Sequence, residues 1–176
     1  EMKDVTRAQV RTFGFGDGAD VQISNFDISM DEQELPQGCS FKLHAEGSFV
    51  PVKIYGSLGR SQAMAAAAAT AVGLNFGMNL VQISDSLSHY RGPSGRLTIL
   101  KGIKDTVIMD DTYNAAPASM HLALETLKHV AVLRRAHDKT TRTIAVLGDM
   151  LELGKFSVDA HRTVGNMAGS VADILV

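Results

Sequence analysis

Apolar and polar side chains alternate along residues 21–29, which predicts a half-buried strand near the N-terminal end of the chain. Val21 and Ile23 keep the alternation, and Phe26 and Ile28 continue it after a slip of one residue. A β-bulge inserts one extra residue into one strand of a pair. We therefore expect a bulge between the two halves of this strand.

Two more alternating runs and two helical runs follow. Residues 40–45 and 49–55 are separated by Glu-Gly-Ser, a short glycine-containing connection that predicts an antiparallel hairpin. Residues 63–71 are mostly alanine, a strong helix former whose small side chain permits close packing, and a second helix is expected at about 80–89. The first half of the chain therefore predicts a small antiparallel sheet with helices.

The second half alternates strands and helices. The segment RGPSGR, residues 91–96, carries two glycines, a proline and a serine, and it is the best candidate for a linker between two domains, 1–94 and 95–176. The elements expected after it are strands at 97–100 and 105–109, a helix at 118–135, a strand at 142–147, a helix at about 158–168 and the start of a further strand. Such alternation predicts an α/β fold with a parallel sheet.

One predicted strand of the second half ends in two carboxylates. Residues 107–109 form an apolar run of the kind that a parallel sheet buries, and Pro117 pre-sets the first turn of a helix. Ligands of open α/β sheets bind at the carboxyl edge, so the loop between strand and helix is expected to face a crevice. Its polar side chains are Asp110, Asp111, Tyr113 and Asn114. The alternative is structural, with both aspartates accepting backbone N–H bonds and capping the helix.

Composition narrows the class of protein. The chain of 176 residues is 45% hydrophobic and 20% charged, which is typical of a globular protein. Its formal net charge of −2 provides no broad attraction for nucleic acid or an anionic membrane, and no apolar run reaches the roughly 18 residues of a membrane span. The single cysteine, Cys39, fits the cytoplasm. The start at Glu1 and the apolar end at Val176 predict a fragment of a longer protein.

Three weaker features are better explained as local structure. GFGDGA, residues 14–19, matches the glycine pattern of dinucleotide-binding loops, but a strand follows it where a helix is required, so a plain glycine turn is expected. Asp149 and Glu152 have the spacing of a capping box, which indicates a structural role. The six histidines show no close metal-ligand pairing with cysteine or carboxylates, and none is assigned to a metal.

Two longer motifs carry a family resemblance. VIMDDTYNAAPASMHLALETL, residues 107–127, resembles the DD-x-YNA-x-P-x-SM signature of the Mur ligases, and TIAVLGDMLELG, residues 143–154, resembles a strand and loop of the same family. Weaker resemblance through GADVQISNF and YGSLGRSQAMAAAAATA extends it over most of the chain. The resemblance implies the end of the central ATPase domain, with a small antiparallel sheet plus helices, followed by part of a Rossmann-like C-terminal domain.

Within the family, the chain looks most like the ligases that add D-alanyl-D-alanine to UDP-N-acetylmuramoyl-tripeptide in peptidoglycan precursor synthesis. The resemblance implies a monomeric enzyme that uses ATP and Mg²⁺ to form an acyl phosphate, which the amine of D-alanyl-D-alanine attacks. No G-x-x-x-x-G-K-[ST] loop occurs in the chain, so the phosphate loop and the metal ligands are expected upstream of Glu1. The fragment alone is therefore expected to be inactive.

The resemblance also implies roles for five residues. Arg96 corresponds to an arginine after the linker that reaches the γ-phosphate, a catalytic role in which a guanidinium neutralises charge. Asp111 corresponds to an aspartate that meets the ribose hydroxyls, and Tyr113 and Asn114 to residues that line the nucleotide. Gln62 stands in a segment associated with the adenine, and its amide can read a base edge.

Two departures from the family pattern leave other functions open. Ser61 stands where the family typically carries a histidine, and it is too short to stack on the adenine. Ala116 stands where an asparagine is common, so one polar contact is missing there. These changes would permit a non-catalytic, Mur-ligase-like subunit that binds a protein partner. A different Mur enzyme or a folylpolyglutamate synthase is the other alternative, although those ligases carry a different loop in place of YNAAP.

Overall fold

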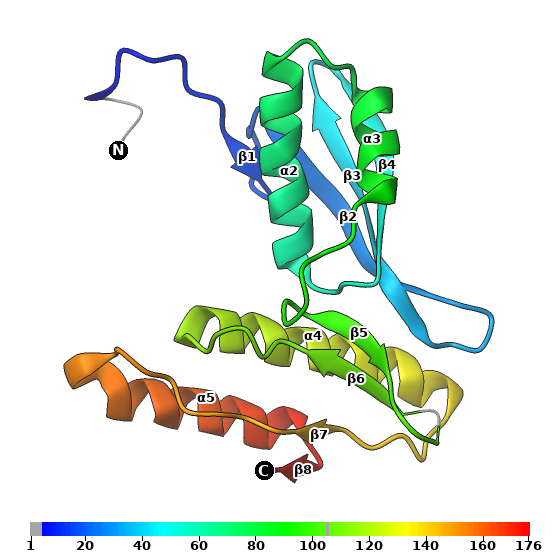
Figure 1. The fold of residues 1–176 in the computed structure, drawn as a ribbon, viewed down its shortest axis with the longest axis vertical. Helices are drawn as coiled ribbons and strands as arrows, with labels where there is room; N and C mark the ends of the chain where they lie inside the picture. Colours follow the sequence, from blue (N-terminus) through cyan, green and yellow to red (C-terminus); the bar gives the residue numbers. More distant parts are fainter. Residues whose placement is uncertain (1–4, 105) are drawn as a thin grey trace.

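The computed structural model describes residues 5–104 and 106–176 and forms two lobes (Figure 1). The first lobe consists of strands β1 (Phe13–Gly14), β2 (Val21–Met30), β3 (Pro36–Ala45) and β4 (Ser48–Tyr55) and helices α2 (Arg60–Asn75) and α3 (Leu80–His89). The second consists of β5 (Thr98–Lys101), β6 (Val107–Asp110), α4 (Pro117–His137), β7 (Ile144–Ala145), the 3₁₀ turn η1 (Gly154–Phe156), α5 (Ser157–Val171) and β8 (Ile174–Leu175). The expected strand start at Asp105 lies outside the described residues.

The sheet of the first lobe has the order β1-β2-β3-β4, with β2, β3 and β4 antiparallel. Ala45 pairs with Ser48, so the hairpin turn contains only Glu46 and Gly47. Both turn residues have positive φ, 52° and 73°, as a type I′ turn requires. The predicted hairpin is confirmed, and β3 begins four residues earlier than the alternating pattern indicated.

The predicted bulge in β2 is also confirmed. The pairing of β2 with β3 shifts register between Ser24 and Asp27, and Asn25 in between adopts φ +52°. Asparagine tolerates this left-handed conformation better than most residues. The extra residue restores the alternation, so that Ile23 and Ile28 are both buried although they lie five positions apart, an odd spacing.

Helix α2 lies close against this sheet because its inward face is built from alanine. Ala63, Ala66 and Ala67 are buried in one cluster with Ile23, Leu43 and other side chains of the strands. Helix α3 begins with a capping box between Asn79 and Gln82 and spans the ten residues that the sequence predicted.

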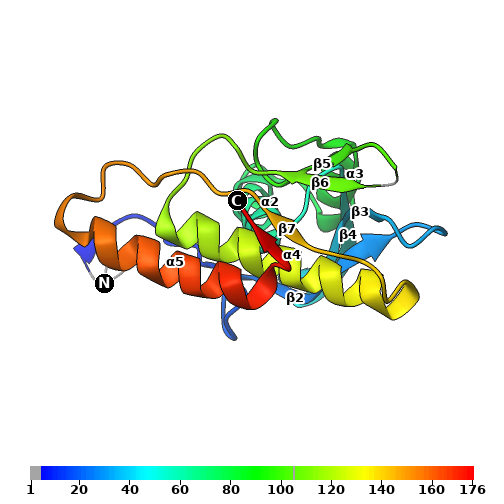
Figure 2. The same ribbon diagram turned by 90° about the horizontal axis from the view of Figure 1, so that it is seen from below.

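The second lobe differs from the expected sheet. Strands β5 and β6 are antiparallel, with Thr98 opposite Asp110, so the parallel order expected for them is wrong. The reason is the short loop 102–106, because parallel neighbours need a crossover of about a dozen residues or more. Strands β7 and β8 have that crossover, α5, and they pair in parallel as predicted. Helices α4 and α5 lie side by side over this pair (Figure 2).

The two lobes meet through backbone hydrogen bonds as well as through the linker. Leu58 N donates to Leu97 O at 2.9 Å, and Ile99 N donates to Gly56 O at 2.9 Å, which attaches the segment after β4 to the edge of β5. Leu58 and Leu97 are both buried in a cluster with Ile28 and Val130, so all four belong to one apolar junction. Burying one leucine contributes roughly 1.5–3 kcal/mol, so this junction holds the lobes together.

Polar contacts surround the apolar junction. His129 of α4 lies 3.3 Å from the carboxylate of Asp27 in β2, and Arg134 donates to the carbonyl oxygen of Glu34 at 3.0 Å. Helix α4 is thereby tied to the end of the first lobe's sheet. Among the described residues, no helix is both long and apolar enough to cross a membrane.

Candidate functional site

The loop between β6 and α4 begins with a tight turn closed by Asp110. Its Oδ1 accepts hydrogen bonds from the backbone nitrogen of Thr112 at 3.2 Å and from the Thr112 hydroxyl at 2.7 Å. These two bonds favour the carboxylate and lower the pKa of Asp110. Asp110 therefore serves the conformation of its own loop.

Asp111 connects the loop to the linker. Its Oδ1 accepts a hydrogen bond from the backbone nitrogen of Leu97 at 3.0 Å. Burial raises the pKa of the Asp111 carboxyl, while the bond from Leu97 and the charge of Arg96 oppose that rise. A carboxylate has about four acceptor sites, so the bond from Leu97 leaves capacity for other donors.

Both aspartates accept backbone N–H bonds, as the structural alternative expected, but neither caps helix α4, so the capping part of that alternative is wrong. The N-cap is Ala116, and the Ser119 hydroxyl accepts from the Ala116 backbone nitrogen at 3.1 Å and donates to its carbonyl oxygen. Pro117 occupies the first helical position, as expected. The carboxylates bond to Thr112 and Leu97 instead because the loop turns away before the helix begins.

Arg96 and Tyr113 lie in contact. The guanidinium carbon of Arg96 is 4.0 Å from the centroid of the Tyr113 ring, a cation–π geometry, and 70% of Tyr113 is exposed. The backbone nitrogen of Tyr113 also donates to the carbonyl oxygen of Gly95 at 3.2 Å. A side chain on Gly95 would place its Cβ 3.0 Å from that nitrogen, and Gly95 adopts φ +73°, so glycine is required here.

Gln62 lies on the opposite side of the same segment, in the first turn of α2. Only 7% of the residue is exposed, and its Nε2 donates to the carbonyl oxygen of Arg96 at 3.1 Å. The amide that the sequence assigned to a base edge is thus engaged with the backbone of the linker. Asn114 stands apart from this group, because it is exposed and its Oδ1 accepts from the next residue, Ala115, at 2.9 Å.

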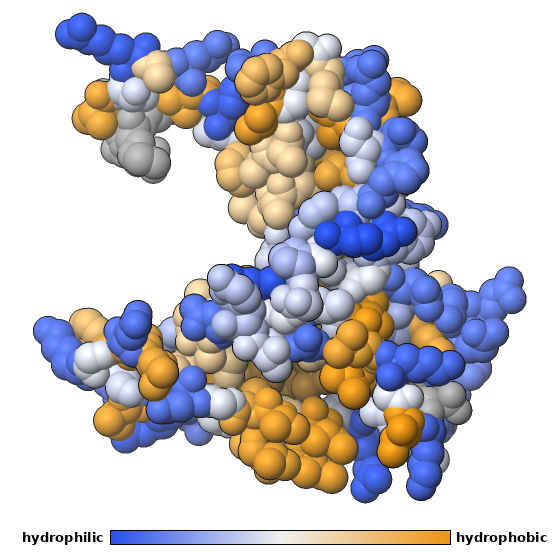
Figure 3. All heavy atoms as spheres, in the orientation of Figure 1, coloured by the Kyte–Doolittle hydropathy of each residue, from blue (hydrophilic) through white to orange (hydrophobic). Residues whose placement is uncertain are grey.

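The structure therefore brings together Gln62, Arg96, Asp111 and Tyr113, which come from three separate segments. Figure 3 shows the surface hollowed between the two lobes, and the linker runs between them at that level (Figure 1). The group offers a cationic fork, an aromatic face and a carboxylate. These are the groups that hold a phosphate, a planar ring and a pair of hydroxyls, so the site fits a nucleotide.

Sequence reasoning missed two residues of this site. Gly95 was noted only as part of a glycine-containing linker. Its position directly before the candidate residue Arg96 was the signal that could have indicated its place in the site. Leu97 appeared only as a strand residue, yet it adopts φ +50°, which is uncommon for a residue with a side chain. No local pattern predicts a leucine in this conformation.

The other candidate motifs have structural roles. Gly14, the first residue of GFGDGA, ends β1, the residues after it form a turn, and strand β2 follows, so the plain glycine turn is confirmed. Asp149 and Glu152 begin no helix, so the expected capping box is wrong. The carboxylate of Asp149 instead pairs with His161 Nε2 at 2.6 Å, and Glu152 adopts φ +62° in the loop before η1.

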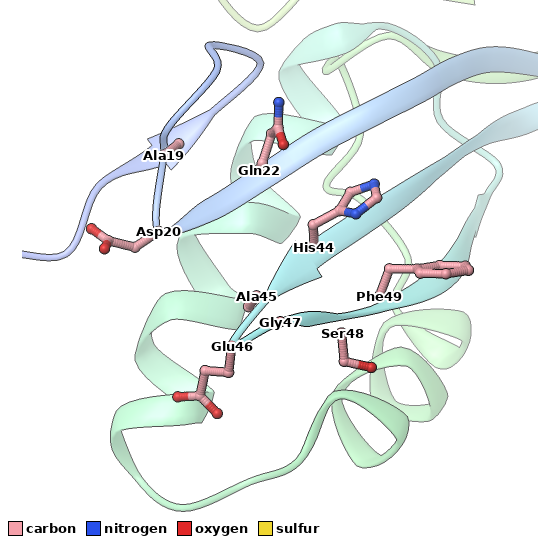
Figure 4. A pocket seen from close by; sticks show the side chains of 9 residues that line it. All are labelled: Ala19, Asp20, Gln22, His44, Ala45, Glu46, Gly47, Ser48 and Phe49. Atoms are coloured by element: carbon pink, nitrogen blue, oxygen red, sulfur yellow. The ribbon is translucent and has the colours of Figure 1, made fainter.

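A separate pocket of about 380 Å³ opens at the far end of the first lobe's sheet (Figure 4). Gln22 and His44 rise beside each other from β2 and β3, next to the ring of Phe49. The hairpin turn at Glu46 forms its edge, whereas Tyr55, at the opposite end of β4, lies beside Arg91 of the linker. This pocket is therefore remote from Arg96.

Comparison with known proteins assigns the chain to a class. Residues 95–176 match the family described as Mur ligase, glutamate ligase domain. The fold agrees with this match, and residues 95–176 belong to the Mur ligase family. Among its curated relatives is the UDP-N-acetylmuramoyl-tripeptide--D-alanyl-D-alanine ligase of Mycobacterium tuberculosis, 32% identical over 142 residues, which are 80% of this chain and 26% of the relative.

Further relatives share the same description or fold. The Bacillus subtilis ligase of that name is 30% identical over 166 residues, which are 93% of this chain and 32% of the relative. The solved structure of MurF from Acinetobacter baumannii has a TM-score of 0.74 and 29% identity, and the match covers 95% of this chain and 33% of that one. The structure of MurF ligase from Thermotoga maritima in complex with ADP has a TM-score of 0.75 and 25% identity, and the match covers 93% of this chain and 34% of that one. The chain thus spans about a third or less of the length of these relatives.

Proposed function

We propose that the full-length protein is an ATP-dependent ligase that joins D-alanyl-D-alanine to UDP-N-acetylmuramoyl-tripeptide. The observation that carries this proposal is the contact of Arg96 with Tyr113 beside Asp111, at the junction of two lobes that are similar to those of ligases with this description. The proposed domains, 1–94 and 95–176, the monomeric state and the cytoplasmic compartment rest on the same similarity and on the single free cysteine.

An unactivated carboxylate is a poor electrophile, so amide formation in water requires an activating group. ATP, with Mg²⁺ held by residues outside this chain, would supply the phosphoryl group that makes the carboxylate an acyl phosphate. Phosphoryl transfer spreads negative charge over several oxygens, and a positioned guanidinium neutralises it. We assign this catalytic task to Arg96, whose planar fork the Tyr113 ring supports.

The remaining residues bind the nucleotide in this proposal. Asp111 accepts hydrogen bonds from the ribose hydroxyls, with its geometry set by the bond from Leu97. Tyr113 and the exposed Asn114 line the nucleotide from the β6–α4 loop. Gln62 contributes through Arg96, because its amide is buried against the Arg96 carbonyl.

The proposal is tested by steady-state kinetics of variants in the full-length protein, with phosphate release measured in the presence of both substrates. Arg96→Lys keeps the charge and loses the fork, so kcat should fall more than the KM for ATP rises. Arg91→Lys in the same linker is the matched control, because the Arg91 guanidinium lies 5.8 Å from the centroid of the Tyr55 ring and away from the site. Wild-type kcat in Arg96→Ala would contradict the catalytic role.

A second variant tests the ribose contact. Asp111→Asn keeps an acceptor for Leu97 N and removes the charge, so the apparent affinity for ATP should fall on the order of tenfold to a hundredfold, as expected for a charge-assisted bond of roughly 1.5–3 kcal/mol. Thermal unfolding of the same variant should change little. A lowered Tm with unchanged ATP kinetics would show that Asp111 is structural, and absence of ATP-dependent ligation in the wild-type protein would favour the non-catalytic subunit.

A further inference from the structure

The backbone around Arg96 is held alternately by the two lobes. Gly95 O accepts from Tyr113 N of the second lobe, and Arg96 O accepts from Gln62 Nε2 of the first. Leu97 N then donates to Asp111 of the second lobe, and Leu97 O accepts from Leu58 N of the first. Four backbone polar groups of residues 95–97 therefore bond to the two lobes in turn.

The central pair of these bonds belongs to one peptide group. Its oxygen, on Arg96, is held by Gln62 at 3.1 Å, and its nitrogen, on Leu97, is held by Asp111 at 3.0 Å. Both partners are side chains, one from each lobe, and each was assigned a contact with the nucleotide from the sequence. The structure shows that both also hold the peptide bond that carries Arg96 into β5.

This peptide orientation is strained. Leu97 adopts φ +50°, a left-handed conformation that costs a residue with a Cβ roughly 1–2 kcal/mol. Rotation of the Arg96–Leu97 peptide plane by about half a turn would move Leu97 to a negative φ, in the broad region open to every residue. The two side-chain bonds oppose that rotation, because it would direct the carbonyl oxygen at the Asp111 carboxylate and the N–H away from it.

We propose that Gln62 is a positioning residue for Arg96: by holding the carbonyl oxygen of Arg96 against α2, it keeps the Arg96–Leu97 peptide in the orientation that places the guanidinium on the Tyr113 ring. The inference rests on the proposed function of Arg96. It replaces base recognition as the role of Gln62, whose amide is buried and engaged. Strain of this kind persists only where the surrounding structure over-determines it, and it concentrates at functional sites.

The first part of the test uses this chain and needs no activity. Gln62→Met has nearly the same shape and no N–H donor, so the chain should fold while the Arg96 carbonyl loses its partner. Hydrogen exchange of the Leu97 amide, followed by NMR, should accelerate roughly tenfold, which corresponds to the loss of one hydrogen bond's stabilisation at the peptide group. The upfield shift that the Tyr113 ring imposes on the side-chain protons of Arg96 should decrease.

Two further variants sharpen the result. Gln33→Met is the matched control, because Gln33 is exposed in the loop between β2 and β3, and it should leave both signals unchanged. Gln62→Glu places a carboxylate against a carbonyl oxygen, and only its protonated form can donate. At each pH, the exchange rate of the Leu97 amide in this variant is divided by the rate in the wild type, which removes the intrinsic effect of pH. This ratio should fall toward one as pH falls.

The second part measures kcat in the full-length protein. Gln62→Met should lower kcat about tenfold with a smaller change in the KM for ATP, and Gln62→Glu should recover activity relative to wild type at lower pH. Unchanged Leu97 exchange and unchanged Arg96 shifts in Gln62→Met would overturn positioning by Gln62, whatever the activity. Displaced Arg96 signals with wild-type kcat would instead contradict the catalytic role of Arg96 and, with it, the proposed function.

Discussion

The guanidinium carbon of Arg96 lies 4.0 Å from the centroid of the Tyr113 ring, although the two residues belong to different segments, the linker and the β6–α4 loop. The contact is partly open, since 70% of Tyr113 is exposed. A cation–π contact at an exposed site contributes about 0.5–1 kcal/mol. The ring therefore supports the arginine without burying it, which leaves the cation accessible to a ligand.

This contact makes a prediction for the full-length protein. Tyr113→Ala should lower kcat about twofold to fivefold, the factor that corresponds to about 0.5–1 kcal/mol. Tyr113→Phe keeps the ring and should stay near wild type. Tyr90→Ala, at another partly exposed tyrosine beside the linker, is the control for a general effect of removing a ring. Equal losses in the alanine and phenylalanine variants would show that the hydroxyl matters and the ring face does not.

Gly95 should be sensitive to the smallest substitution. Gly95→Ala forces a Cβ to 3.0 Å from Tyr113 N at φ +73°, so we expect a loss of about 1–3 kcal/mol in the free energy of unfolding. Gly169→Ala is the matched control, because Gly169 lies within α5 with nothing within 4 Å of the added Cβ, and it should stabilise by roughly 0.5–1 kcal/mol. Urea unfolding of both variants measures the difference. Equal stability of the two would refute the close approach at Gly95.

His161 should make stability depend on pH near neutrality. Two contacts raise the pKa of His161 in the folded chain. The largest single effect comes from the hydrogen bond between Nδ1 and the Ser157 carbonyl oxygen, and the Asp149 carboxylate at Nε2 adds to it. A raised pKa means that protonated His161 stabilises the fold. The contribution is complete below the unfolded pKa of about 6.5 and is lost as pH rises through the higher folded value.

The measurement is the free energy of unfolding between pH 5 and pH 9, compared between wild type and two variants. Asp149→Asn and His161→Gln should each remove part of the decline in stability above about pH 6.5. The loop that begins at Asp149 should also exchange its amide hydrogens faster in both variants, because the ion pair ties this loop to α5. A wild-type profile in His161→Gln would assign the pH dependence to other groups.

Cys39 should be unreactive in the folded chain. The residue is fully buried in the sheet core, and burial raises the pKa of its thiol to about 12. Only the thiolate reacts with disulfide reagents, so labelling at pH 8 should proceed no faster than the chain unfolds. The same chain in denaturant should react at once. Rapid labelling without denaturant would show that the β3 core opens far more readily than this packing implies.

Local signals in the sequence determined most of the elements. Alternation and one slip predicted β2 with its bulge at Asn25, Glu46 and Gly47 predicted the hairpin, and residues 80–89 predicted α3. Each of these signals acts within a few residues, through side-chain periodicity, positive φ or a cap. The family motif at residues 107–127 likewise located the β6–α4 loop and its polar side chains, because the motif is contiguous in the chain.

Only the tertiary structure decided what these side chains bind. Gln62 and Arg96 are separated by 34 residues, and Leu97 and Asp111 by 14, so no periodicity connects either pair. Their bonds depend on α4 packing against the first lobe through Leu58, Leu97 and Val130, which sets where the linker passes. The left-handed φ of Leu97 has the same origin. A local pattern selects the conformation of lowest local energy, whereas here contacts from both lobes hold a conformation that the residue alone would avoid.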